Sequence, residues 1–386
     1  MHTWKTYSQI NVIQLVFRQM ITNDRTNRMG RITVKDIARE LNISAGTVSK
    51  ALSGKKGVSD QMRGQVYNTA RKLGYSINIL AQGLARKPVN VRIVMPSVWG
   101  EFYGYLRYGI EIELNKLIDQ KIYGKFDYVS GLYANDEYRS ILGNYLETCP
   151  DAVIICPALT HDYMDILDAM HDKGIKTIIL GNSLAEGKRF TEIRIASEIA
   201  GSLAAEYASI LCEKKVSIAV FIGNKDMEDH RIKLDNFLKV AKRKNLAVSG
   251  VYETQDDVGI AYLLAKNIIS AQSDLGVIYV ATVNSVAVCK CIVDMGVTDK
   301  IKVIATDIFT DMDHYVQSGV ISATIYQNQI RMGRMAIKEI YNSVTSAEPP
   351  DQEILVYPHL VMQSNYSVYS DYLKKVENGL PNKMFE

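Results

Sequence analysis

Apolar side chains recur at helical spacing between residues 33 and 73. They predict three short helices, over Val34–Leu41, Ala45–Leu52 and Asp60–Leu73, each with an apolar face that can pack against the other two. Asn42 lies between the first two helices, where a residue that tolerates a left-handed backbone ends a helix tightly. Such a bundle is only marginally stable alone, and we place this small helical domain at residues 30–77.

From residue 91 the pattern changes to short apolar runs that alternate with amphipathic helical stretches. The strand-like runs are Val91–Met95, Phe126–Val129, Ala152–Cys156, Thr177–Leu180, Ser217–Ile222, Leu246–Val251, Gly276–Val280 and Lys302–Ala305. Several are apolar almost throughout, as in parallel sheets that are buried on both faces. The alternation predicts a doubly wound α/β fold, and residues 91–365 are long enough for two such lobes.

Charge is distributed unevenly between these two regions. The whole chain has a net charge of +3, but residues 29–90 carry eleven Lys and Arg against three Asp and Glu. Residues 1–28 add a further +3, and the remainder of the chain carries −8. A basic module of this kind favours a polyanion as its partner, although charge alone fits a solvated surface equally well.

Cysteine usage and the N-terminal pattern favour a cytoplasmic protein. The five cysteines are scattered, so we expect free thiols rather than a disulfide framework or a zinc site. No apolar run is long enough to span a bilayer, and Arg18 interrupts the apolar stretch near the N-terminus before any signal-peptide cleavage site. We expect residues 1–29 to be a disordered extension, or the result of a start codon assigned upstream of Met29.

The segment from Val34 to Leu52 has the spacing of a helix-turn-helix. A small residue, Ala38, lies where the second helix must pack closely, Asn42 follows four positions later, and Val48 lies six positions beyond that. In this unit the second helix enters the major groove of DNA. Together with the basic charge, the spacing favours DNA binding over an ordinary small helical bundle.

The chain resembles the lactose-repressor (LacI/GalR) family of bacterial transcription regulators. The resemblance is carried by ITVKDIARELNISAGTVSKALSGKKGVSDQMRGQVYNTARKLGY, then NILAQGLARK, then the two-lobed α/β region. It implies a homodimer that places two recognition helices in successive major grooves of a pseudo-palindromic, double-stranded operator DNA. It also implies a hinge helix within residues 78–90 that folds on the operator.

By this resemblance, Ala45 and Gly46 occupy the main base-reading positions and Lys50 the third. Ala45 can contact a thymine methyl group, and Lys50 can donate to guanine O6 and N7 or contact a phosphate instead. Weak readout at two positions shifts specificity towards DNA shape and the hinge. Hydroxyl side chains suited to phosphate or base contacts lie beside them: Ser44, Thr47 and Ser49.

The hinge segment matches the family at three positions. Asn78 and Ala81 fit the hinge pattern, and Leu84 falls where the family inserts a leucine between base pairs in the minor groove. Ile77 stands where the family usually has proline, and this departure loosens the start of the hinge helix.

The α/β region has no catalytic motif, so we expect neither an enzyme nor a bound metal or cofactor. It contains no G-x-S-x-G, P-loop or His-Glu-x-x-His sequence. It looks like the periplasmic sugar-binding fold, in which two lobes close on a small molecule. Ligands bind beyond the carboxyl ends of the strands in such folds. That rule nominates Ser97, Trp99, Phe102, Tyr103, Asn182, Ser183, Thr282, Asn284, Thr306, Asp307 and Gln327.

The resemblance implies specific roles for several of these positions. Phe102 and Tyr103 match an aromatic pair that flanks the ligand in the family. Asp307 matches the effector-binding aspartate, and Gln327 matches a glutamine at a crossing between lobes. Thr254 lies where a stacking aromatic is common.

Two further positions depart from the family. Lys233 replaces an arginine, and lysine lacks the bidentate fork of arginine, which makes Arg231 the alternative cation. Thr282 replaces a ligand-binding asparagine, and Asn284 is the alternative source of an amide.

Aromatic rings with Asp, Asn, Gln and a cation suit a neutral polyhydroxyl effector, a sugar or sugar derivative. A nucleobase is the alternative, because Phe102 and Tyr103 could stack on one. For Trp99 and Tyr103, a contact in the core or in a dimer is the alternative to ligand binding.

We therefore expect a transcription regulator, most simply a repressor, whose operator affinity an effector in the inter-lobe cleft controls. A nucleobase-responsive repressor and a solute receptor that does not bind DNA are the alternatives. The expected lobes are 91–196 with 327–357 and 197–326 with 358–365, followed by a C-terminal tail at 366–386. The tail lacks leucine heptads, which favours a dimer over a coiled-coil tetramer.

Overall fold

The computed structural model describes residues 32–52, 57–73, 87–97, 100–131, 133–157, 163–183, 190–212, 216–345 and 352–377. The chain divides into two compact units, a headpiece within residues 1–82 and a body that consists mainly of residues 83–386. Several predictions concern residues outside the described ranges: the extension at 1–29, most of the hinge with Asn78, Ala81 and Leu84, and Trp99.

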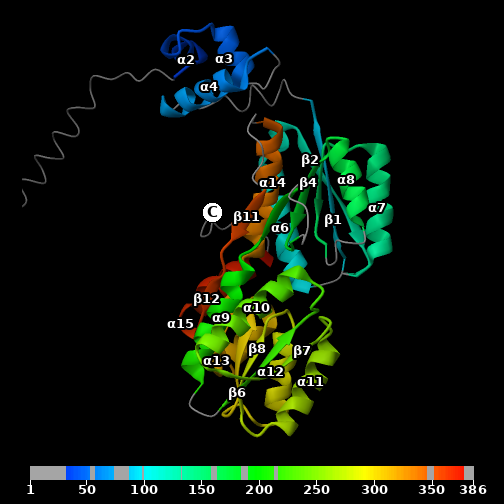
Figure 1. The fold of residues 1–386 in the computed structure, drawn as a ribbon, viewed down its shortest axis with the longest axis vertical. Coiled ribbons are helices and arrows are strands. Elements are labelled where there is room, and N and C mark those ends of the chain that lie inside the picture. Colours follow the sequence, from blue (N-terminus) through cyan, green and yellow to red (C-terminus); the bar gives the residue numbers. More distant parts are fainter. Residues whose placement is uncertain are drawn as a thin grey trace, which may run out of the picture. The chain divides into compact units, whose positions relative to one another are not determined.

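The headpiece contains three helices, α2 (Val34–Glu40), α3 (Ala45–Leu52) and α4 (Asp60–Lys72), as the sequence predicts (Figure 1). Their apolar faces share one core, which is formed by Ile37, Ala38, Val48, Ala51, Leu52, Val66 and Ala70. This spacing of α2, turn and α3 is that of a helix-turn-helix.

Local hydrogen bonds fix the ends of these helices. The carboxylate of Asp36 accepts a hydrogen bond from the backbone N–H of Thr33 at 2.8 Å, which closes a capping box at the start of α2. Asn42 has a φ of 53° and provides the tight turn before α3. Arg63 of α4 donates to the carbonyl of Ala51 at 3.1 Å, which ties the third helix to the end of the second.

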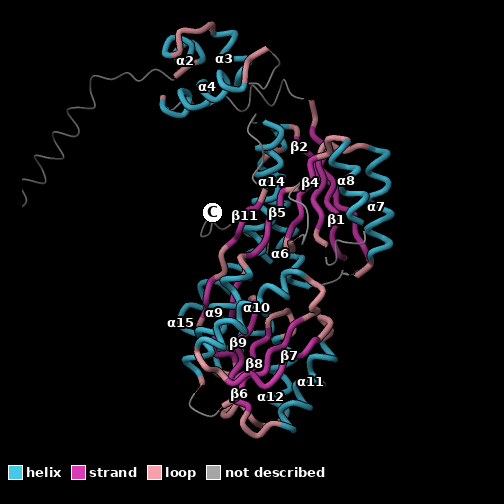
Figure 2. Tube along the Cα trace, viewed as in Figure 1, coloured by secondary structure: helices cyan, strands magenta, loops and turns pink. Residues whose placement is uncertain are grey.

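The body contains two six-stranded sheets (Figure 2). The first is parallel throughout, with the order β11-β5-β4-β3-β1-β2. Its strands are β1 (Val89–Pro96), β2 (Ile122–Val129), β3 (Ala152–Ile155), β4 (Lys176–Leu180), β5 (Thr191–Ile195) and β11 (Glu353–Val356). The order brings residues from both ends of the body's sequence into one lobe, the N-lobe.

The second sheet has the order β12-β10-β9-β8-β6-β7 and builds the C-lobe. Its strands are β6 (Ser217–Ile222), β7 (Ala247–Glu253), β8 (Leu275–Val280), β9 (Lys302–Thr306), β10 (Ile321–Tyr326) and β12 (His359–Val361). They are parallel except that β12 runs antiparallel to β10. The chain therefore passes between the two sheets after β5, after β10 and after β11.

Helices cover both faces of each sheet, which explains why the strands are apolar on both sides. In the N-lobe, α6 (Gly100–Lys116) and α14 (Gln329–Thr345) pack on one face, and α7 (Asn135–Thr148) and α8 (Met164–Asp172) on the other. In the C-lobe, α9 (Ser197–Leu211) and α10 (Glu228–Arg243) cover one face. The opposite face carries α11 (Val258–Ala271), α12 (Ser285–Asp294), α13 (Asp313–Gln317) and α15 (Gln363–Glu377).

The C-terminal segment differs from the expected tail. Instead of a tail from residue 366, the chain forms helix α15, and Tyr366, Tyr372, Leu373 and Val376 are buried in the core of the C-lobe. The helical spacing of these four apolar residues was the signal in the sequence that could have predicted a helix here. The segment has no leucine heptads, but it has an apolar stripe, and the C-lobe buries that stripe.

Candidate functional site

The exposed side of α3 is the candidate DNA-binding surface. The hydroxyl of Ser44 accepts a hydrogen bond from the backbone N–H of Thr47 at 2.9 Å, which caps the start of the helix. Gly46 and Lys50 are exposed, whereas Val48 beneath them is fully buried. All the residues expected to read bases or phosphates in the headpiece lie on or next to this helix: Ser44, Ala45, Gly46, Thr47, Ser49 and Lys50.

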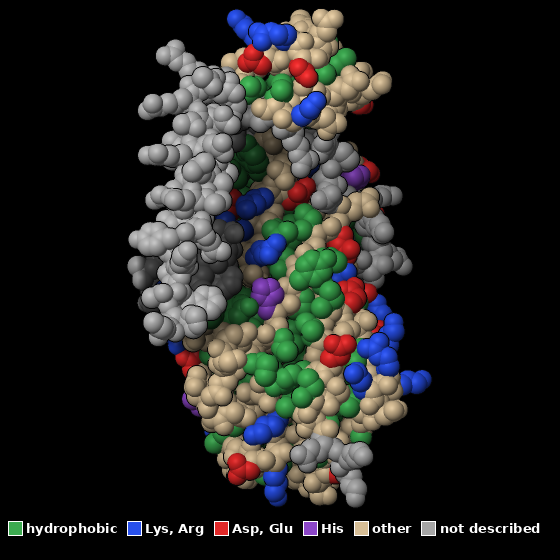
Figure 3. Space-filling model, turned by 90° about the vertical axis from the view of Figure 1, so that its left-hand side faces the viewer, with side chains coloured by type: hydrophobic (Ala, Val, Ile, Leu, Met, Phe, Trp, Pro, Cys, Tyr) green, Lys and Arg blue, Asp and Glu red, His purple; other side chains and the backbone are tan. Residues whose placement is uncertain are grey.

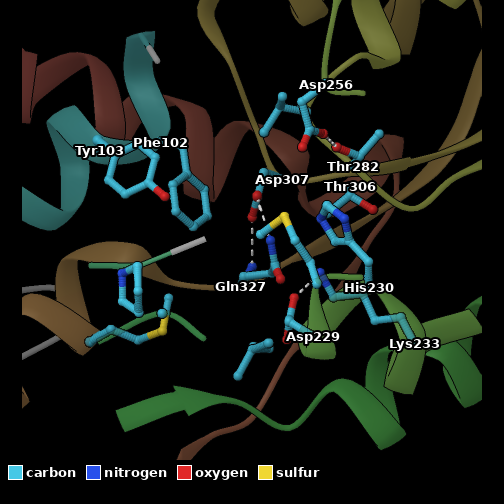
Figure 4. Close-up of a pocket in the computed structure, with 16 residues that line it drawn as sticks. Phe102, Tyr103, Asp229, His230, Lys233, Asp256, Thr282, Thr306, Asp307 and Gln327 are labelled. Atoms are coloured by element: carbon cyan, nitrogen blue, oxygen red, sulfur yellow. Dashed lines mark hydrogen bonds and ion pairs between the residues drawn. The ribbon is translucent and has the colours of Figure 1, made fainter. Parts of the chain in front are cut away.

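The candidate effector site is a pocket of the body to which both lobes contribute (Figure 4). It encloses a cavity of about 60 Å³. Most of its lining residues follow the carboxyl ends of strands, where ligands of doubly wound folds bind. They are Phe102, Tyr103, Pro157, Gly181, Ile195, Met227, Asp229, His230, Lys233, Asp256, Thr282, Val283, Thr306, Asp307, Gln327 and Met332.

Two aromatic rings from the first turns of α6 form one side of the pocket. The ring centroids of Phe102 and Tyr103 are 5.1 Å apart, and the rings stand nearly perpendicular, at 76°. In Figure 4 they lie across the cavity from the acidic and basic side chains of the C-lobe. Burial raises the pKa of the Tyr103 hydroxyl well above its usual value, so this hydroxyl stays protonated and can donate a hydrogen bond.

Asp307 and Gln327 join the ends of β9 and β10 at the floor of the pocket. The carboxylate of Asp307 accepts from the backbone N–H of Gln327 at 3.0 Å and from its side-chain amide at 2.6 Å. Asp307 is fully buried, and burial raises its pKa to about 6. Its backbone has a φ of 64°, an uncommon conformation for a residue with a side chain, and the surrounding contacts hold it there.

Helix α10 contributes a buried ion pair. Lys233 Nζ lies 2.7 Å from Asp229 Oδ2, and the side chains of Lys233 and Asp229 are only 3% and 8% exposed. The hydroxyl of Ser197 donates to the other carboxylate oxygen of Asp229. Burial raises the pKa of Asp229, but the neighbouring Lys233 and His230 and the hydrogen bonds from Lys233 and Ser197 together hold it below the usual value. The carboxylate of Asp229 is therefore ionised at neutral pH.

A histidine and a third carboxylate complete the polar wall. The backbone N–H of Asn224 donates to Nδ1 of His230 at 3.1 Å, and burial lowers the pKa of the ring, which is therefore neutral with its proton on Nε2. Thr282 donates its hydroxyl hydrogen to Oδ1 of Asp256. Both Asp256 and the preceding Gln255 have positive φ angles, of 55° and 53°.

Seven of the expected effector-binding residues line this pocket: Phe102, Tyr103, Lys233, Thr282, Thr306, Asp307 and Gln327. Asn182 does not line it, but it supports the wall, because its side-chain oxygen accepts a hydrogen bond from the backbone N–H of Asp229 at 3.3 Å.

Arg231 and Asn284, the expected alternatives to Lys233 and Thr282, do not line this pocket. Arg231 is half exposed and pairs with Glu228 and Asp235 along the surface of α10. Asn284 is buried and its amide is used by the protein itself, because it accepts from the hydroxyl of Thr254 at 2.9 Å. Of each pair of alternatives, the residue that lines the pocket is Lys233 rather than Arg231 and Thr282 rather than Asn284.

Sequence reasoning missed Asp229, His230 and Asp256. Asp229 lies one helical turn before Lys233, so the spacing of a lysine and a carboxylate four apart was an available signal. Asp256 follows the end of β7, where the strand-end rule would have found it. For His230 the sequence holds no comparable signal.

In the part of the chain that the structure describes, no group of three or more His, Cys, Asp or Glu side chains is arranged to hold a metal ion. Nor does any described helix combine the length and the apolar character needed to cross a bilayer.

Fold and pocket together define a two-lobed binding-protein body that follows a helix-turn-helix headpiece. Residues 93–348 match the family model of the periplasmic binding protein domain, and residues 33–78 match that of the bacterial regulatory proteins of the lacI family. The chain therefore belongs, through its body, to the periplasmic binding protein domain family, and its headpiece is a helix-turn-helix domain of the lacI family.

Relatives with curated names include several proteins called catabolite control protein A. The one from Staphylococcus xylosus is 27% identical over 196 residues, which is 50% of this chain and 55% of that protein. The one from Streptococcus mutans is 24% identical over 62% of this chain and 70% of its own length. The one from Priestia megaterium is 38% identical over 81 residues, 21% of this chain and 24% of that protein. The match to the first of these thus spans about half of its length.

Solved structures with a similar body are sugar-binding and solute-binding proteins. The glucose-galactose binding protein GanP from Geobacillus stearothermophilus superposes with a TM-score of 0.66 at 16% identity, over 72% of this chain and 99% of that one. A solute-binding protein from Burkholderia graminis in complex with D-arabinose gives 0.68 at 18% identity, over 73% and 98%. Identities this low establish a shared fold.

Proposed function

We propose that this protein is a transcription regulator that binds a pseudo-palindromic operator as a dimer and responds to a small effector, a sugar or sugar derivative. The observation that carries the proposal is the combination of an exposed recognition helix with a body that contains a buried polar pocket. A regulator of this kind acts in the cytoplasm, where bacterial DNA lies.

Charge and surface support the DNA-binding part. Residues 29–90 carry a net charge of +8, which provides the salt-dependent attraction to phosphates. Small side chains at Ala45 and Gly46 let the start of α3 approach base edges closely, and Lys50 in its last turn is exposed. Specificity then rests on few direct base contacts, with DNA shape and the hinge supplying the rest.

Pocket chemistry supports a sugar over a nucleobase. Carboxylates, hydroxyls and an amide suit a ring that carries many hydroxyl groups, and the two aromatic rings can cover its C–H faces. Phe102 and Tyr103 stand at 76° to each other, so a flat base could lie parallel to only one of them. Solved neighbours carry the same kind of ligand, D-arabinose and myo-inositol among them.

Coupling between the two sites follows from the connections between lobes. The chain passes from one sheet to the other after β5, β10 and β11, and an effector that contacts both lobes favours one angle between them. A typical coupling free energy of about 1–3 kcal/mol would change operator affinity roughly 5- to 150-fold. This geometry allows an effector either to weaken operator binding, as in induction, or to strengthen it, as in co-repression. The sign of the change in operator affinity distinguishes the two.

Exposed apolar side chains support a homodimer. In the N-lobe, the aromatic side chains of Phe126 and Tyr128 lie on β2. The guanidinium group of Arg107 of α6 lies over them, 5.5 and 5.9 Å from the centres of their rings. β2 is an edge strand, which a second copy could cover. Exposed hydrophobic residues also occur in the C-lobe, as at Leu263 of α11, and on the face shown in Figure 3 hydrophobic side chains gather in a band between charged ones.

The test starts from the full-length protein and a selection of random duplexes for binding. The expected result is a two-fold symmetric consensus whose affinity changes when a sugar is added. A matched pair of duplexes, one with an altered half-site, provides the control. Failure to enrich any sequence would contradict the DNA-binding part, whereas an operator indifferent to every sugar and nucleobase would contradict the effector part. A monomer or a tetramer by light scattering would contradict the dimer.

A further inference from the structure

The charges that line the effector pocket are unequal. Three carboxylates, Asp229, Asp256 and Asp307, face a single ammonium group, that of Lys233. His230 adds no charge, because burial lowers the pKa of its ring. Three Asp side chains against one Lys give the described lining a formal excess of two negative charges.

The ammonium of Lys233 is not available for an anionic ligand. It lies 2.7 Å from Asp229 in a pair that is almost fully buried. Drawing Lys233 away towards a phosphate would leave the carboxylate of Asp229 buried and uncompensated, which is strongly destabilising. Arg231, two residues away, is held on the surface of α10 by Glu228 and Asp235.

Asp229 has Lys233 and Asp307 has two donors from Gln327, whereas among the described residues Asp256 has one donor to its carboxylate and no paired Lys or Arg. Asp256 is only 5% exposed, and its Oδ1 accepts the hydroxyl hydrogen of Thr282. Within the described part of the chain, no donor binds its Oδ2 and no Lys or Arg forms an ion pair with it. The nearby Lys225 pairs instead with Glu253 at 2.9 Å.

The surrounding structure holds Asp256 at the pocket wall. Its backbone N–H donates to the hydroxyl of Thr254 at 3.3 Å, and its carbonyl accepts from the amide of Asn284 at 3.3 Å. The preceding residue, Gln255, donates its backbone N–H to the carbonyl of Gly223 at 2.8 Å. A buried carboxylate that is fixed in this way and lacks a counter-charge is costly unless a ligand supplies one.

Aromatic rings stand near this carboxylate. Figure 4 shows Tyr103 and Phe102 across the cavity from Asp256. The hydroxyl of Tyr133 donates to the sulfur of Met227, another lining residue, at 3.6 Å. After burial, the charge of Asp256 is the next strongest influence that raises the pKa of Tyr133, and it also raises that of Tyr103. A cation bound in the cavity between Asp256 and these residues would also be attracted to the electron-rich faces of their rings.

We propose that the effector is a small polyhydroxyl compound with a protonated amine, of the amino-sugar class, whose ammonium group binds Asp256, and that the pocket rejects phosphorylated sugars. This inference rests on the proposed function, because it specifies the ligand of the same pocket. Asp307, Gln327 and the hydroxyl of Thr282 then remain for the hydroxyl groups of the ligand.

Binding of matched ligands to the full-length protein, measured by titration calorimetry, tests the inference. For the gluco, galacto and manno configurations, the panel contains the hexose, the 2-amino-2-deoxyhexose and the hexose 6-phosphate. The expected result is that one amino sugar binds at least roughly tenfold more tightly than its parent hexose and that no phosphate binds. An equal or tighter affinity for a hexose or a phosphate would overturn the proposal and leave the proposed function intact.

Two variants separate the role of Asp256 from a general effect of charge. Asp256→Asn should remove the preference for the amine, so that the amino sugar and its parent hexose bind within about twofold of each other. Asp226→Asn removes the same charge at an exposed position and should keep the preference. A preference that survives in Asp256→Asn overturns the assignment. If no member of the panel binds while the operator is still bound, the sugar effector of the proposed function fails, and this inference fails with it.

Discussion

The carboxylate of Asp307 accepts two hydrogen bonds from one residue, Gln327: the backbone N–H donates at 3.0 Å and the side-chain amide at 2.6 Å. Asp307 follows β9 of the C-lobe, and Gln327 follows β10 at the point where the chain leaves that lobe for α14 of the N-lobe. The acidic group expected to bind the effector is thus bonded directly to one of the three connections between the lobes.

The raised pKa of Asp307 predicts a pH-dependent stability. Because the folded pKa is about 6 and the usual value is 3.8, Asp307 favours the folded state most below pH 4, and this contribution is lost as the pH rises to 6. The shift corresponds to a change on the order of 3 kcal/mol. Asp307→Asn should therefore gain stability relative to the parent as the pH rises from 4 to 7. Urea unfolding at several pH values measures this, with the exposed Asp235→Asn as the control. Parallel stability curves for parent and Asp307→Asn would contradict it.

The buried pair of Lys233 and Asp229 predicts a large cost for removing one partner. Lys233→Met should lower the free energy of unfolding by about 3–5 kcal/mol, because it leaves a buried carboxylate without its cation. Arg231→Met removes a surface cation from the same helix and should cost less than about 1 kcal/mol. Chemical unfolding measures the free energy of unfolding of both variants. Equal losses would contradict the prediction that the buried cation contributes more than the exposed one.

Close packing of α6 on α14 predicts that two glycines cannot be enlarged. A Cβ atom at Gly109 would lie 2.1 Å from the carbonyl oxygen of Ile330, and one at Gly333 would lie 2.2 Å from that of Leu106. Gly109→Ala and Gly333→Ala should each destabilise the body by about 1–3 kcal/mol through forced separation of the helices. Gly104 lies on the same helix with open space around it, so Gly104→Ala should be neutral or stabilising. The melting temperatures of the three variants test this prediction. If Gly104→Ala lowered the melting temperature as much as the other two variants do, close packing of the helices would not be the cause.

Lys50 has two possible contacts with DNA, and one variant distinguishes them. If Lys50 reads a guanine, Lys50→Gln should relax specificity at one base pair of each half-site and cost about 1–3 kcal/mol. If it contacts a phosphate, the variant should weaken binding to all sequences and reduce the salt dependence of the affinity. Lys72→Gln on the exposed side of α4 serves as the comparison. Operator affinity unchanged by Lys50→Gln, at all salt concentrations, would exclude both contacts.

Local pattern was sufficient for most of the secondary structure. The predicted bounds of α3 and β6 agree with the structure, because capping residues, turns and apolar periodicity are local properties. Short strands such as β5 and β12 escaped notice, since five or fewer residues carry little periodicity and only their neighbours in the sheet make them strands. The C-terminal helix α15 was missed for a related reason, because its apolar stripe has meaning only against the C-lobe.

The sequence by itself determined the helix-turn-helix, the two-lobed α/β class and the strand ends at which a ligand site would lie. Only the tertiary structure decided which side chains reach that site. Arg231 and Lys233 are two positions apart on one helix and therefore point to different sides, so the packing of α10 selects Lys233 for the pocket and leaves Arg231 outside. Asp256 and Thr282 are distant in sequence and follow β7 and β8, the two strands that flank β6 in the sheet, and the fold brings the hydroxyl to the carboxylate. Such choices depend on burial and long-range contacts, which no local pattern encodes.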